Sequence, residues 1–508
     1  MRGRSPRRLA LWRSLGFLVV LLPLLRPDLL LRHSSPSWMS LFSEWEAPSA
    51  QHSVLMASLA ESNMNSSRSG ESALLWHPPD NDGWAPCLRQ SVGSISSSNF
   101  YLQVFLEGGL NQQRMGVCDA VAVAKILNAT LVVPHLDVNP VWQDSSSFAD
   151  IYDVDYFIDY LAADVKIVKG LPSEFYWSTR EYYATGFRAT RVKDAPVHAR
   201  PSWYVANVLP ILQSYGVAAI APFSHRLAFD EVPPEIQKLR CKVNFHALRF
   251  VKAITSVGDV IVSRLRQAQN DSPPSKFVAL HLRFDKDMAA HSACDFGGGR
   301  VEQLALAYYR HKVWQGRVPN SRLTVQQLRL LGKCPLTPEE AGLTLAALGF
   351  GPHTRVYLAS HQIYGGEARL SFLKNIFPLM QDKASLAIDA ELRPFERKAS
   401  LSAALDYYVC LKSDFFLSAS PGNMHNAVLF QIGHRTYQNV QKTLRPDMVL
   451  LSRLFSNSSM EWPEFQNRVY NGHRNRLGQV RLRQPKQSIY TYPAPDCMCK
   501  SNIRHRIR

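Results

Sequence analysis

Three segments of the sequence combine polar side chains with signals of a strand end and a helix start. The first is Glu107-Gly108-Gly109-Leu110-Asn111, which follows an apolar run and precedes a helical pattern. Backbone N–H groups at a helix N-terminus hold anions or hydroxyl groups, and glycine permits close approach because it has no Cβ. Gly-Gly before a helix is also an ordinary tight turn, but Glu107 and Asn111 add a carboxylate and an amide to the same place.

The second segment holds His281 and Arg283 at the end of the apolar run 276–284. Residues two apart on a strand face the same side, so both side chains leave a buried element together. The arginine fork donates two parallel hydrogen bonds and suits a diphosphate. In the other interpretation Arg283 pairs with Asp285 or Asp287 and only fixes a loop. The spacing alone favours neither.

The third segment is Ser418-Ala419-Ser420-Pro421-Gly422-Asn423, where a strand passes through hydroxyls and Pro-Gly into a helix. It is another N-terminus that suits an anion, although propensity alone favours an ordinary Ser N-cap. His281, His291 and His425 share no metal-ligand spacing, and the sequence has no Walker, Gly-x-Gly-x-x-Gly or Gly-x-Ser-x-Gly motif. We therefore expect no metal and no cofactor.

The elements that carry these segments alternate between strand and helix. We expect strands at 100–106, 130–134, 276–284, 354–360, 385–388 and 414–418, and helices at 111–128, 366–377, 401–412 and 421–432. This rhythm predicts an α/β protein of two doubly wound, Rossmann-like units that face a central cleft. The layout is that of GT-B glycosyltransferases, and other two-domain α/β enzymes share it.

The charge of the chain is concentrated at its ends. The net charge is +17, of which residues 1–32 carry +6 and residues 471–508 carry +8, so residues 33–470 carry only +3. A nucleic-acid binder usually carries its basic patch on the folded body, so we exclude nucleic acid as a partner. The 46% hydrophobic and 19% charged residues are ordinary for a folded protein.

The N-terminus predicts entry into the secretory pathway. An Arg-rich start precedes the apolar run 14–25, which becomes long enough to span a membrane as 9–31 if Arg13 and Arg26 snorkel. A cleaved signal peptide and an uncleaved anchor both fit. We favour an anchor, because no small-residue cleavage site follows and residues 33–72 form a stem with 13 Ser.

Sequons and cysteines fit the same compartment. We expect glycosylation at Asn65, Asn128 and Asn457. The eight Cys include no Cys-x-x-Cys pair, so zinc is not expected, and disulfides would form in a secretory protein. Cys118 and Cys410 lie in apolar helical stretches and are predicted to be buried thiols.

Taken together, these segments resemble the GDP-fucose protein O-fucosyltransferase family in its plant-type branch. The resemblance covers about residues 98–450, and several unrelated motifs occur in the same order. The matching stretches are 107–114 (EGGLNQQR), 128–134 (NATLVVP), 281–288 (HLRFDKDM), 334–340 (CPLTPEE), 405–408 (LDYY) and 412–414 (KSD).

The resemblance implies a GT-B fold and an inverting, metal-independent transfer of fucose from GDP-fucose to a hydroxyl of a protein or glycan. It assigns Arg283 to the donor diphosphate and its departure, with His281 and the Leu282 backbone beside it. It places Asp287 in the same substrate site. In the C-terminal loop it assigns Ser420, Gly422 and Asn423 to substrate binding, although this loop departs from the Thr/Gly-rich form of the family.

In the N-terminal half the resemblance places Gly108 or Gly109 and Asn111 beside the sugar. Glu107 matches the general base of some relatives, although the loop differs in length by one residue. The same branch is similar to enzymes that add rhamnose from UDP-rhamnose to pectin, and an inactive glycan-binding scaffold is a further alternative. We expect a type II, single-pass Golgi membrane protein with its catalytic part in the lumen.

The resulting division of the chain has five parts. Residues 1–32 are the basic tail and anchor, 33–97 the stem, and 98–275 the acceptor-side domain. Residues 276–450 are the nucleotide-sugar domain, and 451–508 are a C-terminal extension with a basic tail.

Overall fold

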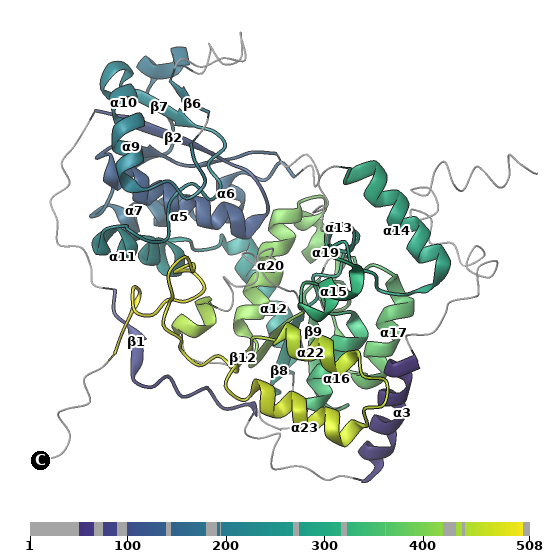
Figure 1. The fold of residues 1–508 in the computed structure, drawn as a ribbon. Coiled ribbons are helices and arrows are strands. Elements are labelled where there is room, and N and C mark those ends of the chain that lie inside the picture. The colour runs from purple at the N-terminus through teal and green to yellow at the C-terminus, as the bar shows by residue number, and fades with distance from the viewer. Residues whose placement is uncertain are drawn as a thin grey trace, which may run out of the picture.

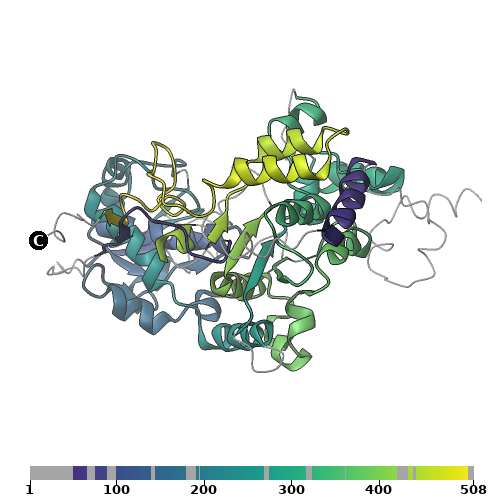
Figure 2. The same ribbon diagram turned by 90° about the horizontal axis from the view of Figure 1, so that it is seen from below.

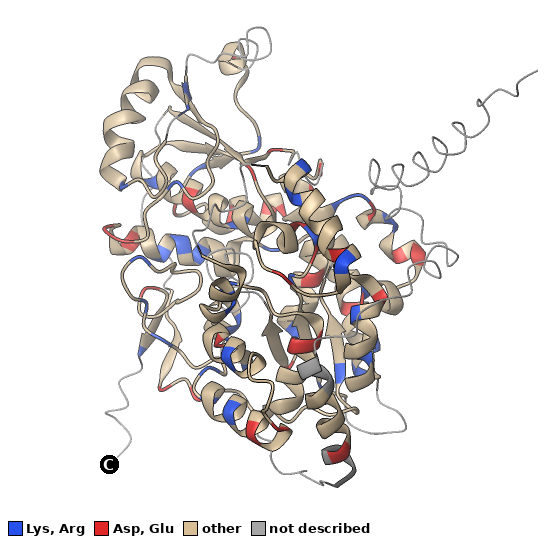
Figure 3. Ribbon diagram, turned by 45° about the vertical axis from the view of Figure 1, so that its right-hand side comes forward, with Lys and Arg blue, Asp and Glu red and all other residues tan. Residues whose placement is uncertain are grey.

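The computed structural model describes residues 50–65, 75–88, 99–138, 144–178, 190–193, 195–267, 274–315, 323–360, 362–419, 433–438 and 442–500. Two parallel sheets with their covering helices form the body and lie side by side (Figures 1 and 2). Lys and Arg are interspersed with Asp and Glu over the described ribbon (Figure 3), as expected for a body of low net charge.

The N-terminal sheet has the strand order β5-β3-β2-β7-β6, with β4 also paired to β2, and all of its pairs are parallel. After β2 the chain forms β3 and β5 on one side of β2. It then crosses to the other side, where β6 lies at the edge and β7 pairs with β2. The order therefore reverses between β2 and β7. The strands are β2 (Tyr101–Leu106), β3 (Thr130–Val132), β4 (His135–Leu136), β5 (Ile167–Val168), β6 (Arg191–Val192) and β7 (Val217–Ile220).

Helices cover this sheet, and the central one is apolar almost all round. That helix, α5 (Leu110–Ile126), buries every residue from Gln113 to Ala124 because it lies between β2 and α11. The helices of this part are α5, α6 (Phe148–Ile151), α7 (Val154–Leu161), η2 (Ser173–Phe175), α9 (Pro201–Asn207), α10 (Leu209–Tyr215), α11 (Pro234–Lys242) and the π-helical η3 (Val243–Ala247).

The C-terminal sheet repeats the same plan with the order β10-β9-β8-β11-β12, again parallel throughout. Here the order reverses between β8 and β11. The two doubly wound α/β units of the predicted GT-B-like fold are therefore confirmed. The strands are β8 (Phe277–His281), β9 (Arg355–Leu358), β10 (Met380–Gln381), β11 (Phe415–Ser418) and β12 (Lys442–Leu444).

The helices of the C-terminal half include one that begins before its sheet. That helix, α12 (Lys252–Arg266), packs against α20 and so joins the two units. The others are α13 (Lys286–His291), α14 (Gly299–Val313), α15 (Val325–Leu330), α16 (Pro338–Ala347), α17 (Gly366–Ile376), α18 (Lys383–Leu386), α19 (Asp389–Leu392), η4 (Arg393–Phe395), α20 (Ala399–Lys412), α22 (Met448–Phe455) and α23 (Trp462–His473).

One predicted strand is wrong. Residues 385–388 were expected to form a strand, but Asp382 accepts a hydrogen bond from the Ser385 N–H and so begins the short helix α18. The edge strand is β10, a few residues earlier. The predicted helix 421–432 lies outside the described residues.

Both ends of the described chain fold back onto the body. Residues 50–65 lie within the predicted stem, yet they form α3 (Ala50–Asn65), which buries Leu55 and Leu59 against the C-terminal half. At the other end, β13 (Met498–Lys500) pairs antiparallel with β1 (Trp84–Pro86). Figure 1 shows this C-terminal segment, in yellow, running back from α23 toward the N-terminal half. The five-part division of the chain stays a prediction. The described parts of the predicted stem and of the C-terminal extension, however, pack against the two α/β units.

The predicted anchor at 1–32 also lies outside the described residues. In the part of the chain that the structure describes, no helix combines the length and apolarity needed to cross a membrane.

Candidate functional site

The carboxyl ends of β8, β9 and β11 bring the His281 segment together with the start of the 418–423 loop. His281 is in register with Ser418, and its carbonyl accepts a hydrogen bond from the Ala419 N–H at 3.0 Å. The Leu282 carbonyl accepts from the Ser360 hydroxyl, which follows β9. This is the reversal point of the sheet, where open α/β sheets bind their ligands.

His281 is held in one tautomer. Its Nδ1 lies 2.8 Å from the Ala359 carbonyl, which can only accept, so Nδ1 carries the proton and Nε2 is left as an acceptor. Burial lowers the pKa of His281, and the positive charge of Arg283 lowers it further. A neutral imidazole at this position accepts a hydrogen bond from a hydroxyl rather than donating one to phosphate.

Arg283 lies just beyond β8 and is paired with a neighbour. Its Nη1 lies 3.2 Å from Oδ2 of Asp285, and 36% of its side chain is exposed. Burial still alternates from Leu280 to Phe284, so Arg283 faces the same side as His281. The loop contact considered from the sequence therefore exists, and its partner is Asp285. The partly exposed guanidinium is also accessible to an anion.

Asp287, which was predicted to bind substrate, is engaged by α14. Its Oδ1 accepts hydrogen bonds from the Tyr309 hydroxyl at 2.7 Å and from Trp314 Nε1 at 3.2 Å. Lys286 lies over the Tyr309 ring at 3.8 Å from its centroid. Burial and the Asp287 carboxylate raise the pKa of Tyr309, so its hydroxyl keeps its proton and donates. Asp287 thus faces the long helix α14 in this structure.

A half-buried polar cluster next to His281 was not identified from the sequence. Asp406 accepts hydrogen bonds from Lys383 Nζ and from the Tyr357 hydroxyl, both at 2.6 Å. Lys383 also reaches the Ser360 carbonyl at 3.3 Å. Asp406 lies in the Leu-Asp-Tyr-Tyr motif, which was the available signal, but nothing in the sequence links it to Lys383.

In the N-terminal half the Glu107–Asn111 turn lies at the reversal point between β2 and β7. Gly108 has a φ of +92°, a backbone conformation that favours glycine, and a Cβ there would displace the end of the Gln112 side chain. Gly109 is the N-cap of α5, and its N–H donates to Gln112 Oε1 at 3.2 Å. The Gly109 N–H, which was expected to be available to a ligand, is therefore already hydrogen-bonded to a side chain of α5.

Asn111 and Glu107 keep unused acceptors at this turn. The Oδ1 atom of Asn111 is buried and has no hydrogen-bond donor among the described residues. Glu107 is exposed, and its carbonyl accepts from the Ser224 hydroxyl at 2.9 Å, which ties the turn to the loop after β7. The Glu107 carboxylate makes no ion pair within the described chain.

The predicted site residues therefore form two groups, each at the reversal point of its own sheet. His281, Leu282 and Arg283 share one, and Glu107, Gly108, Gly109 and Asn111 share the other. Within the described residues no hydrogen bond or ion pair joins them. Ser420, Gly422 and Asn423 lie outside the described residues. Over the same described part, no three His, Cys, Asp or Glu side chains gather as metal ligands would.

Six of the eight cysteines form three disulfides, and the two predicted thiols are confirmed. Disulfides join Cys87 to Cys499, Cys241 to Cys497 and Cys294 to Cys334. Cys118 and Cys410 are buried and free, and burial raises the pKa of the Cys118 thiol to about 12.

The predicted glycosylation sites differ in the exposure of the Asn and of the rest of its sequon. Asn457 is exposed in a turn where its Oδ1 accepts from Ser459, the third residue of its own sequon. Asn128 is exposed, but Thr130 of its sequon is buried in β3. Asn65 ends α3, and the rest of its sequon is outside the described residues.

Comparison with known proteins identifies relatives along almost the whole chain. A model of the family "GDP-fucose protein O-fucosyltransferase" matches residues 101–438. O-fucosyltransferase 31 of Arabidopsis thaliana is 57% identical over 507 residues, which cover 96% of each chain. O-fucosyltransferase 39 of the same plant is 61% identical over 453 residues, which cover 85% of this chain and 89% of that one.

Solved structures resemble the chain only distantly. A crystal structure of POFUT1 in complex with GDP is 15% identical and has a TM-score of 0.37, covering 67% of this chain and 96% of that one. At this level the likeness bears on neither the fold nor the ligand.

Proposed function

Since this chain belongs to the GDP-fucose protein O-fucosyltransferase family, we propose that it transfers fucose from GDP-fucose to a hydroxyl of a protein or glycan. Membership makes it a glycosyltransferase, and it confirms the resemblance inferred from the motifs. The donor, the acceptor and the stereochemistry are our proposals.

One observation carries the donor proposal: His281 and Arg283 lie at the reversal point between β8 and β11. As the bond between fucose and the diphosphate breaks, negative charge accumulates on the departing oxygen. A guanidinium fixed beside it stabilises that charge more than it stabilises the bound donor. Arg283 is partly exposed there, and the donor phosphates would compete with Asp285 for it.

The N-terminal turn supplies a candidate base. In an inverting transfer the acceptor hydroxyl gives up its proton, its oxygen bonds to the sugar carbon, and GDP leaves from the opposite face. The exposed Glu107 carboxylate is free to take that proton, and Asn111 Oδ1 offers a further acceptor. This proposal uses only groups of the chain and no metal.

We also propose that the protein is a type II Golgi membrane protein, anchored by residues 1–32. Three disulfides support an oxidising compartment such as the lumen of the secretory pathway. In sealed Golgi vesicles, added protease should leave the body intact until detergent is added. Digestion without detergent contradicts the topology, and a mature N-terminus near residue 33 makes the anchor a cleaved signal.

The donor proposal is tested by measuring the nucleoside diphosphate that the purified full-length protein releases from each sugar-nucleotide donor. GDP-fucose should be hydrolysed slowly without acceptor, and UDP-rhamnose should not be hydrolysed. Turnover of UDP-rhamnose alone favours a rhamnosyltransferase, and turnover of neither donor favours an inactive scaffold.

A further inference from the structure

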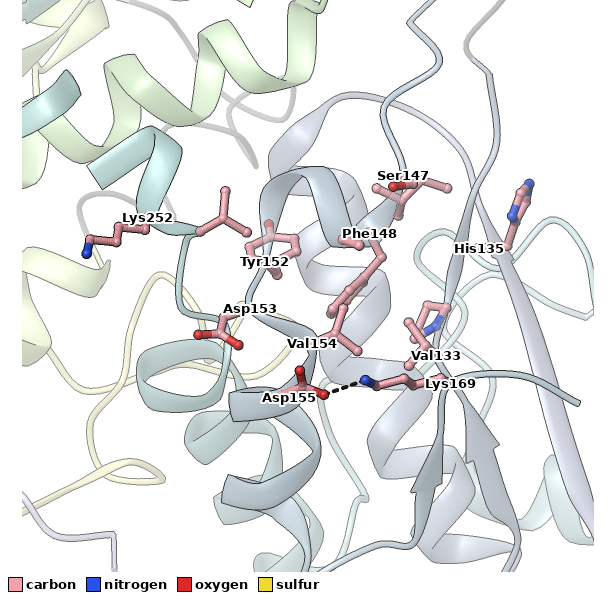
Figure 4. Close-up of a pocket in the computed structure, with 14 residues that line it drawn as sticks. Val133, His135, Ser147, Phe148, Tyr152, Asp153, Val154, Asp155, Lys169 and Lys252 are labelled. Carbon is pink, nitrogen blue, oxygen red and sulfur yellow. Dashed lines mark ion pairs between the residues drawn. The ribbon is translucent and has the colours of Figure 1, made fainter. Parts of the chain in front are cut away.

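A pocket of about 590 Å³ opens in the N-terminal half beside β4 (Figure 4). Its walls come from the segment after β3, the starts of α6 and α7, the end of β5 and the first turn of α12. Sites for small molecules commonly enclose about 300–1,000 Å³. The pocket is therefore large enough for a few sugar rings and too small for a folded domain.

The position of the pocket connects it to the proposed reaction. β4 pairs with the last residues of β2, with Leu136 opposite Leu106, and Glu107 follows Leu106 directly. On the other side, Val251 and Lys252 begin α12, which packs against α20 of the C-terminal half. One side of the pocket thus lies next to the Glu107–Asn111 turn, which was predicted to lie beside the sugar. The other side is formed by the start of α12, which leads to the C-terminal sheet.

The walls combine an apolar surface with one polar pair. Val133, Phe148 and Val154 contribute apolar side chains. Asp155 Oδ1 and Lys169 Nζ lie 2.6 Å apart, and Figure 4 shows this pair between the α7 and β5 walls. Both side chains are largely exposed, at 75% and 65%, so they are accessible to a ligand. Apolar walls with a few fixed donors and acceptors match the C–H faces and hydroxyls of a sugar.

Little charge in the pocket remains uncompensated. The Asp153 carboxylate accepts the Tyr156 N–H and caps α7. His135 lies 3.6 Å from Asp137. In Figure 4 the Lys252 side chain points away from the other labelled residues. The Asp155–Lys169 pair is neutral as a unit and the Asp153 carboxylate is negative, so these wall residues offer no unpaired positive charge to attract an anionic ligand.

We propose that this pocket binds a neutral glycosyl unit of the acceptor, and that the acceptor is therefore a glycan chain. The inference rests on the proposed transferase function and adds the class of acceptor. A folded protein acceptor would instead need a broad contact surface, on the order of 800 Å² on each partner. A pocket of this size and chemistry suits a few sugar rings of a glycan chain, and it lies on the same edge of the sheet as the Glu107 turn.

The test uses two substitutions on the rim and two matched controls. Ala149 is an exposed residue of α6 that lines the pocket, so Ala149→Trp fills the space without removing a core contact. Its control is Ala368→Trp at an exposed position of α17. Asp155→Asn breaks the rim pair, and Glu367→Gln breaks an equally short pair with Lys374 on α17.

Binding is measured on the full-length chain by saturation-transfer NMR titration with GDP present. The probes are a neutral galactotetraose, a neutral arabinotetraose, trigalacturonic acid and a folded disulfide-rich protein domain with exposed Ser and Thr. We expect at least one neutral tetrasaccharide to bind, with its Kd raised more than tenfold by Ala149→Trp and severalfold by Asp155→Asn. Both controls should match the wild type, and the Kd for GDP should be the same in all five proteins.

Three results overturn the inference: no neutral probe binds, binding is unaffected by both rim variants, or only the acid or the protein domain binds. Failure of the proposed function is a separate result, because it shows as a wild-type chain that neither binds nor hydrolyses GDP-fucose. Melting temperatures of the variants identify any that fail to fold. If Ala149→Trp fails to fold, Asp155→Asn still tests the inference, because it changes only an exposed ion pair.

Discussion

Arg283 and Asp285 form an ion pair in which one partner also begins a helix. Asp285 accepts from Arg283 Nη1 through Oδ2 and from the Met288 N–H through Oδ1, and so caps α13. The carboxylate thus holds the arginine at the strand end without enclosing it. Arg283 can therefore fix the loop through Asp285, bind a donor diphosphate, or do both. Substitutions distinguish these two roles.

For Arg283→Ala we expect a folded protein whose turnover of GDP-fucose falls about 10²–10³-fold, the usual cost of losing a group that stabilises developing charge. Arg283→Lys should recover only part, because a single ammonium cannot make the bidentate contact. Steady-state rates and melting temperature are measured on the same preparations.

The matched control for this prediction is Asp285→Asn, which breaks the ion pair but keeps an oxygen to cap α13. It should retain most of the turnover. If Arg283→Ala lowers only the melting temperature and Asp285→Asn does the same, Arg283 serves the loop alone.

We expect His281 to titrate below the usual His pKa of about 6.5. Burial and the Arg283 charge lower its pKa, so the imidazole is neutral at pH 7 and gains a proton only as the pH falls through the lowered value. The stability that depends on the neutral form is then present above 6.5 and is lost on the acid side. The His281 Cε1 proton, followed by NMR against pH, should show this, and Arg283→Ala should move the midpoint upward. An unchanged midpoint in that variant contradicts the proximity of the two charges.

Tyr309→Phe removes one of the two donors that fix Asp287. One hydrogen bond contributes about 0.5–1.5 kcal/mol, so the loss in unfolding free energy should be small. If Asp287 acts in the donor site, its looser orientation should raise the KM for GDP-fucose severalfold. Tyr308→Phe, one residue earlier on α14, is the control. Equal donor KM in both variants means that the contact is structural only.

Removing the bridge between Cys241 and Cys497 should destabilise the protein by roughly 2–5 kcal/mol, because the bridge constrains the unfolded chain. The Cys241→Ser/Cys497→Ser double variant is compared with Cys118→Ser, which breaks no bridge. Urea unfolding gives the free energies. A double variant as stable as the control contradicts the pairing.

Asn457→Gln should increase gel mobility if Asn457 carries a glycan, since its sequon lies in an exposed turn. Asn128→Gln should leave the mobility unchanged, because Thr130 is buried in a strand. Treatment with a peptide-N-glycosidase should remove the difference between the wild type and Asn457→Gln.

The alternation of strand and helix was readable from the sequence because each element has its own apolar period. The runs that became β2 and β11 are continuous and flanked by turn residues, so they were predicted within one residue of their observed bounds. The run 276–284 was predicted too long, because β8 ends at His281. The 385–388 strand failed because a side-chain cap decides that segment: Asp382 and Ser385 bond to each other's N–H groups and close a helical turn.

Features that depend on distant partners could not be predicted. Asp406 of α20 and Lys383 at the start of α18 are 23 residues apart and meet only in the folded chain, where the lysine donates to the carboxylate. The capture of Asp287 by α14 depends on how that helix lies over α13. The pocket draws its walls from five separate segments, none of which carries a recognisable motif.

The pairing of β1 with β13 has a consequence for how the protein is made. Cys87 and Cys241 belong to the N-terminal half, but their partners, Cys499 and Cys497, are translated 412 and 256 residues later. At about 5–20 residues per second, Cys241 waits on the order of 13–50 s for its partner to be synthesised. During that interval the N-terminal half lacks the strand and both bridges that complete it. A chain whose synthesis stops before residue 497 therefore leaves Cys87 and Cys241 without their partners, in addition to the free thiols of Cys118 and Cys410.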